Sequence, residues 1–156
     1  MIPRERIKLL RNKKGELEKI LPVKIRTNEE VTLESEDPST LMSVKKVIEA
    51  FGRGFNLDTA MNLLDENYSL DIIKVNEFTH SRKRQISLKG RVIGFRGSSK
   101  RFIEKMCNIK ITVYGKTICI IGRRDRIKLA REAIEMLLNG KKHNTVYRFL
   151  ENEVKE

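Results

Sequence analysis

A four-residue segment with a glycine at each end, Gly94-Phe95-Arg96-Gly97, constrains the fold of this chain more than any other feature. Residues 82–88 before it and residues 98–107 after it are both predicted to be helical. Loops that bind nucleotide cofactors follow a β-strand, so a glycine loop between two helices belongs to a different kind of fold. Because glycine has no Cβ, another group can closely approach the backbone of this loop.

The residues around this loop are strongly basic. Segment 89–100 holds three glycines and four basic side chains in twelve positions. The whole chain has a net charge of +12, but residues 82–131 alone hold 16 basic and 2 acidic side chains, a net charge of +14. Charge concentrated in one folded segment predicts a surface that binds a polyanion, and the alternative is a basic face that is merely solvated.

The second half of the chain is predicted to contain strand, helix, glycine loop, helix, two strands and a long helix. The expected ranges are 70–75, 82–88, 98–107, 109–113, 117–121 and 125–138, with a last amphipathic helix over 145–153. The short turn Tyr114-Gly115-Lys116 joins the two later strands into a hairpin. Asp125 is expected to cap the long helix, and Gly140 to end it.

The first half repeats this order in a reduced form. The expected elements are a helix over 4–10, a lysine-rich loop ending at Gly15, a helix over 16–21, a hairpin over 23–25 and 31–33, and helices over 37–52 and 57–65. No leading strand is expected, because Met1 and Ile2 leave no room for one. Alignment of Gly15 with Gly97 places Asn12 where Gly94 stands. We therefore expect a degenerate copy with a structural or partner-docking role.

Two further glycine motifs are expected to be structural. Gly115-Lys116-Thr117 is similar to the end of a P-loop, but position 110 is lysine where a P-loop has glycine, and residues 117–121 favour a strand. The G-x-G of residues 51–55 follows a helix, so a corner between two helices is expected there.

Other classes of function have little support in the sequence. Cys107 and Cys119 are predicted to be reduced, buried thiols, and His80 and His143 lack ligand spacing, so neither a metal site nor a cofactor is expected. No nucleophile with a nearby histidine and no carboxylate pair suggests an enzyme. No apolar run reaches the ~18 residues of a membrane span, and the N-terminus is too charged for a signal peptide, so we expect a cytoplasmic protein without a membrane partner.

A G-x-x-G loop between two short helices is typical of the KH domain, which clamps about four nucleotides of single-stranded nucleic acid. The predicted fold is α+β, with two tandem type I KH modules of βααββα topology, the first degenerate, and a C-terminal helix. The expected domains are 1–66, 67–140 and 141–156. The residues expected to contact RNA are Lys89, Arg91, Ile93, Gly94, Phe95, Arg96, Gly97, Ser98, Lys100, Arg101 and Ile111. Val92, Phe102 and Ile103 are expected to join Ile93 and Ile111 in an apolar floor under the bases.

The chain also resembles the Partner-of-Nob family of ribosome-assembly proteins, in its short archaeal form. The resemblance extends from Asp37 to about Glu151 and is strongest over 113–117, 130–138 and 143–150, while 51–55 and 60–65 are similar to the family's link between modules. It implies a non-catalytic factor that binds the 3′ region of small-subunit ribosomal RNA and assists the endonuclease that matures this end. It also implies the alpha subunit of initiation factor two as a partner.

One alternative function remains open, an adaptor whose KH modules dock protein partners while RNA contact is secondary. The last helix, with Tyr147, Phe149 and Leu150, is then either a partner face or, as we expect more, packed on the protein's own core.

Overall fold

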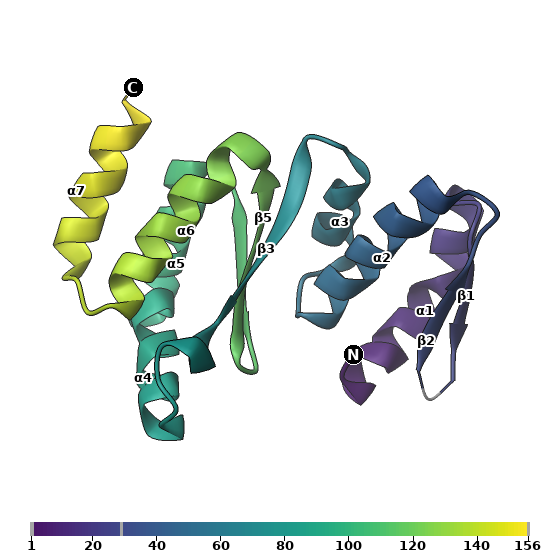
Figure 1. The fold of residues 1–156 in the computed structure, drawn as a ribbon, viewed down its shortest axis with the longest axis horizontal. Helices are drawn as coiled ribbons and strands as arrows, with labels where there is room; N and C mark the ends of the chain where they lie inside the picture. The colour runs from purple at the N-terminus through teal and green to yellow at the C-terminus, as the bar shows by residue number, and fades with distance from the viewer. Residues whose placement is uncertain (1, 29, 156) are drawn as a thin grey trace. The chain divides into compact units, whose positions relative to one another are not determined.

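The computed structural model describes residues 2–28 and 30–155 and divides the chain into two compact units, Met1–Glu66 and Asn67–Glu156. Figure 1 shows the elements of each unit. None of the helices within the described residues is long and apolar enough to cross a membrane.

The second unit is a three-stranded antiparallel sheet covered by helices on one face. Its elements are β3 (Tyr68–Lys74), α4 (Arg82–Ile93), α5 (Ser98–Cys107), β4 (Lys110–Tyr114), β5 (Thr117–Arg123), α6 (Arg124–Leu138) and α7 (His143–Val154), with short 3-10 turns at Val75–Glu77 and Phe95–Gly97. The sheet order is β3-β5-β4, and α4, α5 and α6 pack on one face of it (Figure 1). The predicted α+β class and the order of elements are confirmed.

The hairpin and the terminal helix of this unit follow from local sequence. Tyr114 pairs with Thr117, so Gly115 and Lys116 form a two-residue turn, and Gly115 has the positive φ of 56° that such turns require. The helix α7 buries Val146 and Leu150 completely, so it packs on the core of its own unit.

Two helix boundaries differ from the predictions. The helix α4 continues through Gly90 to Ile93, because the expected end at residue 88 gave too much weight to glycine as a helix breaker. The helix α6 begins at Arg124, so Asp125 is not its cap. Asp125 lies in the first turn, where the positive end of the helix dipole stabilises its carboxylate. The carboxylate also forms an ion pair of 3.6 Å with Arg123.

The first unit contains α1 (Arg4–Ile20), β1 (Lys24–Thr27), β2 (Val31–Glu34), α2 (Pro38–Gly52) and α3 (Leu57–Ala60), which is followed by a 3-10 turn at Met61–Leu64. The prediction of a glycine loop at residues 11–15 is wrong, because α1 is one uninterrupted helix of 17 residues. The apolar side chains of Ile7, Leu10 and Leu17 keep helical spacing across this region and are buried. Their burial outweighs the roughly 1 kcal/mol that a glycine costs inside a helix.

The rest of the first unit follows the predicted pattern. The Asp37 side chain accepts a hydrogen bond from the Ser39 backbone N–H at 3.0 Å and caps α2, with Pro38 as its first residue. After α2 the chain turns at Gly54, where φ is 104°, so residues 51–55 form the expected helix–helix corner. The next short segment buries Leu57, Ala60 and Leu63, which lie three residues apart.

Candidate nucleic-acid interface

The backbone of the glycine loop has, at both ends, positive φ angles that strongly favour glycine. Gly94 has φ 76° and ψ 175°, and Gly97 has φ 76° and ψ 13°. A Cβ at Gly94 would lie 2.6 Å from Ser99 Cβ and 2.7 Å from the Ser99 backbone nitrogen, which cannot move aside. Gly94 is therefore required both by its φ angle and by the close packing of the first turn of α5.

Hydrogen bonds hold the loop between its two helices. The Gly94 N–H donates to the Gly90 carbonyl at 2.8 Å, and the Gly97 N–H donates to the Gly94 carbonyl at 3.2 Å. Arg96 has a positive φ of 53°, and its carbonyl accepts a hydrogen bond of 2.6 Å from the Arg101 guanidinium. The loop leads directly into α5, whose first N–H groups carry the positive end of the helix dipole, a favourable place for a phosphate.

Phe95 projects from the middle of the loop. It is 79% exposed, the most exposed of the large apolar side chains that the structure describes. The Arg96 guanidinium carbon lies 5.1 Å from the centre of its ring, within the range of a cation–π contact. An exposed aromatic ring next to a cation can stack on a base while the cation contacts a phosphate.

An apolar strip continues from the loop along α4. Ile93 and Ile86 are 37% and 66% exposed, and Gly90 lies between them with nothing within 4 Å of the position of a Cβ. Residues 86, 90 and 93 recur at spacings of four and three and therefore share one face of the helix. The sequence analysis missed Ile86 and Gly90 as site residues, although their helical spacing from Ile93 could have identified them.

The loop and the start of α5 bring several predicted basic contacts together. Arg96 and Arg101 are exposed and Lys100 is half-buried, and Ser98 is exposed at the first position of α5. Three more exposed cations, Arg82, Lys83 and Arg84, lie in the first turn of α4, where the helix dipole disfavours positive charge. Their position is unfavourable for helix stability and suits an anionic ligand.

The structure gives Arg91 and Lys89 contacts within the fold. The Arg91 guanidinium donates to the Leu137 carbonyl at 3.0 Å and to the Lys141 carbonyl, while the Arg91 carbonyl is 2.8 Å from His143 Nε2. Arg91 thus satisfies carbonyls at the C-terminus of α6, where a cation is favourable. The Lys89 ammonium donates to the Gly115 carbonyl at 2.8 Å and links α4 to the hairpin turn, although an ammonium group keeps two further N–H donors.

The apolar floor is smaller than the sequence analysis expected. Ile111 is only 2% exposed, and Val92 and Ile103 are fully buried in the core of the unit. They lie on the inner faces of β4, α4 and α5, and the Ile111 N–H donates to the Glu104 carboxylate at 3.0 Å. The side chains of Ile86, Ile93 and Phe95 provide the exposed apolar surface instead, while Phe102 is partly buried, with its ring centre 4.1 Å from that of Tyr147.

The two cysteines of this unit are both buried. Burial raises the pKa of the Cys107 thiol to about 11, with Arg126 opposing the shift, so the thiol is protonated near neutral pH. Neither cysteine forms a disulfide, and the described residues hold no cluster of three or more His, Cys, Asp or Glu side chains suited to a metal ion.

Comparisons with known proteins agree with this geometry. The sequence model for the second KH domain of PNO1, described as a eukaryotic type KH-domain (KH-domain type I), matches residues 69–155. A KH domain-containing protein of Methanocaldococcus jannaschii is 36% identical over 162 residues, which cover 97% of this chain and 71% of that protein.

Solved structures match the whole chain. A protein of unknown function from Aeropyrum pernix is 32% identical with a TM-score of 0.91, covering 99% of this chain and 88% of its own. Dim2p from Pyrococcus horikoshii is 36% identical with a TM-score of 0.85, covering 97% and 95%. A structure of the a/eIF2alpha–aDim2p–rRNA complex from the same organism is 35% identical with a TM-score of 0.88, covering 99% and 91%. The chain therefore belongs to the Partner-of-Nob (PNO1) family of type I KH-domain proteins.

Proposed function

We propose that this protein is a non-catalytic, RNA-binding ribosome-assembly factor that holds a single-stranded segment on Gly94–Gly97. The observation that carries the proposal is the loop itself, whose two glycines have positive φ angles and which opens a helix beside an exposed aromatic ring and an apolar helix face. A KH domain clamps about four nucleotides with such a G-x-x-G loop.

The mechanism assigns a different role to each part of the site. Phosphates approach the backbone at Gly94 and Gly97 and the first N–H groups of α5, with Arg96 and Lys100 neutralising their charge. Bases rest on Ile93 and Ile86 across the open surface at Gly90, and Phe95 stacks on a base at the edge of the loop. Arg91 and Lys89 position the site indirectly, because their side chains bind α4 to α6 and to the hairpin turn.

We further propose that the RNA is the 3′ region of small-subunit ribosomal RNA and that binding assists maturation of that end. A relative with 35% identity was solved in complex with rRNA and a/eIF2alpha, which supports RNA and the alpha subunit of initiation factor two as partners of this chain. The endonuclease that cuts this end is a further proposed partner, because the family resemblance implies it.

Fluorescence anisotropy tests the proposal with labelled single-stranded RNA of the small-subunit 3′ end against a scrambled RNA. The variant Phe95→Asp/Arg96→Asp should lose selective binding. Its control, Lys128→Glu/Asn144→Asp, makes the same change of three charge units at exposed positions of α6 and α7. Equal binding of both RNAs by the wild type, unaffected by the loop variant, would reject the groove.

A protein adaptor is the second candidate, supported by the presence of a/eIF2alpha in the complex of the Pyrococcus relative. Pull-downs with and without RNase separate the two functions, because an adaptor keeps its protein partners after RNase treatment. A nuclease assay on the pure protein, with and without divalent metal, tests the non-catalytic assignment, and metal-dependent cleavage would overturn it.

A further inference from the structure

Three elements of the first unit, β1, β2 and α2, can be matched residue by residue with β4, β5 and α6 of the second unit. The helices α2 and α6 both have 15 residues, so Pro38 corresponds to Arg124 and Gly52 to Leu138. The buried positions then coincide, with Val44, Val47, Ile48 and Phe51 of α2 matching Ala130, Ala133, Ile134 and Leu137 of α6.

The hairpins match in the same way. Ile25 pairs with Leu33 in the first unit, and Ile111 pairs with Ile120 in the second, with Ile25 and Ile111 both buried. Because directly paired residues of an antiparallel ladder lie on the same face, Leu33 holds the position of Ile120, and Val31 holds that of Ile118. Strand β2 is thus the counterpart of β5.

Strand β5 is paired on both edges, whereas β2 is paired on one. In the second unit β3 pairs antiparallel with β5, with Asp71 opposite Ile120 and Ile73 opposite Ile118. In the first unit, within residues 2–28 and 30–155, the sheet has only β1 and β2. The free edge of β2 keeps a row of backbone N–H and C=O groups that can template another strand.

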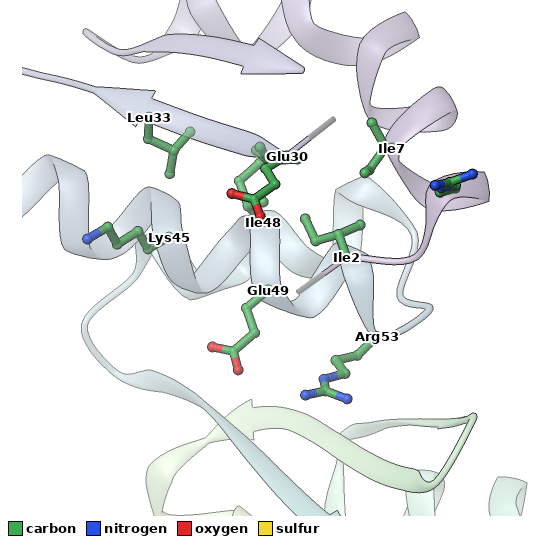
Figure 2. A pocket seen from close by; sticks show the side chains of 10 residues that line it. Ile2, Ile7, Glu30, Leu33, Lys45, Ile48, Glu49 and Arg53 are labelled. Atoms are coloured by element: carbon green, nitrogen blue, oxygen red, sulfur yellow. The ribbon is translucent and has the colours of Figure 1, made fainter. Parts of the chain in front are cut away.

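A cavity of about 620 Å³ lies beside this free edge. Its lining includes Val31 and Leu33 of β2, Ile7 of α1, and Lys45, Ile48 and Glu49 of α2 (Figure 2). Val31 and Leu33 are half-buried, while their counterparts Ile118 and Ile120, which β3 helps to cover, are fully buried. The cavity therefore lies beside β2 and α2, and the corresponding place in the second unit, beside β5 and α6, is occupied by β3.

Two charged residues that line this cavity hold the positions of two residues that form ion pairs in the second unit. The Arg131 guanidinium of α6 binds Asp71 of β3 at 2.6 Å and Glu135 at 2.6 Å. By the helix correspondence, Lys45 matches Arg131 and Glu49 matches Glu135. Within the described part of the chain Lys45 forms no ion pair closer than 4.0 Å, so it lacks a carboxylate like that of Asp71.

We propose that the free edge of β2 is a docking site for an extended segment of a partner protein, which adds antiparallel as a third strand. The segment carries an acidic residue that faces Lys45 next to Leu33, and an aliphatic residue two positions later that faces Val31 and Ile7. This is the pattern of Asp71-Ile72-Ile73 in β3. Main-chain hydrogen bonds provide affinity in such strand addition, and the alternating side chains provide specificity.

A fluorescent peptide with the β3 sequence, Tyr68–Lys74, is the probe, and anisotropy measures its binding to the full chain. Lys45→Glu should weaken binding about fivefold or more, and a peptide carrying lysine in place of Asp71 should bind this variant better than the wild type. Lys46→Glu is the matched control, because Lys46 is exposed on α2 and does not line the cavity. RNA affinity, measured on the same variants, should not change.

A tethered form of the peptide makes a negative result decisive. The β3 sequence is fused ahead of Met1 through a flexible Gly/Ser linker, which raises its effective concentration to the order of mM. Hydrogen exchange should then slow at those amides of residues 31–34 that point to the free edge, and should remain fast there when the fused strand carries lysine for aspartate. Unchanged exchange in both fusions would overturn the proposal. So would a dimer of the chain alone that Leu33→Asp dissociates, because the occupant would then be a second copy.

Discussion

Single residues in the glycine loop determine whether the backbone can reach an anion. Gly94 and Gly97 both have φ near 76°, and the N-terminus of α5 begins directly after them. The sequence analysis identified these glycines because the conformation is a local property of the loop. It could not foresee that Ile111 faces the core or that the Arg91 side chain binds the Leu137 carbonyl of α6, because both contacts join residues distant in sequence.

Substitution of Gly94 and Gly90 should separate a strained position from an open one. Gly94→Ala should lower the free energy of unfolding by about 1–3 kcal/mol, since its Cβ meets the backbone of Ser99 at a positive φ. Gly90→Ala should raise it by up to about 1 kcal/mol, because the helical position is open, while the added methyl group weakens RNA binding. Chemical denaturation and anisotropy give the two readouts. A stable Gly94→Ala protein would contradict the loop geometry.

The Cys107 thiol should make stability depend on pH in the alkaline range. Burial raises its pKa from the ordinary value of 9.0 to about 11 in the folded protein. A raised pKa means that the stabilisation is fully present below pH 9 and is lost as the pH rises toward 11. Denaturation at several pH values should show this fall, and Cys107→Ala should reduce it. An identical pH dependence in both proteins would argue against a protonated buried thiol.

At the scale of helices and strands, the sequence predicted the elements correctly where residues close together in the chain determine the local structure. The Asp37-Pro38 start of α2, a short turn at residues 114–116 and the full extent of α5 were all predicted, and the structure narrows the turn to Gly115 and Lys116. Two of the failures, the loop predicted inside α1 and the early end predicted for α4, involve a glycine inside a helix. In each case the burial of an apolar face continues across the glycine, and tertiary packing overrides its weak local preference.

A substitution at Gly15 tests the continuous helix α1. The position is exposed, its φ is negative and a Cβ would meet nothing within 4 Å, so Gly15→Ala should raise the free energy of unfolding by about 0.5–1 kcal/mol. Thermal and chemical denaturation measure the change. A destabilised Gly15→Ala protein would instead indicate a turn with positive φ at this position, as in the loop of the second unit.

At the scale of the whole molecule, the two units share matched elements but present different surfaces. The second unit keeps the glycine loop, the exposed Phe95 and a strand on both edges of β5, while the first unit has a continuous α1 and a free edge on β2. The charge follows the same division, with a net +14 in residues 82–131 and −1 in residues 1–81. The sequence analysis recognised the duplication and the charge asymmetry, but the cavity became visible only when paired strands could be compared.

The concentration of positive charge in residues 82–131 predicts how RNA affinity depends on salt. If three or four phosphates of a single strand are neutralised, the logarithm of the affinity should fall with that of the salt concentration at a slope of about −2 to −3. Lys100→Ala and Arg96→Ala should each make the slope shallower by about 0.7, since each removes one phosphate contact. Lys46→Ala, an exposed position of α2, is the control and should leave the slope unchanged. A slope near zero, or an equal effect of all three variants, would mean that the glycine loop does not hold the RNA backbone.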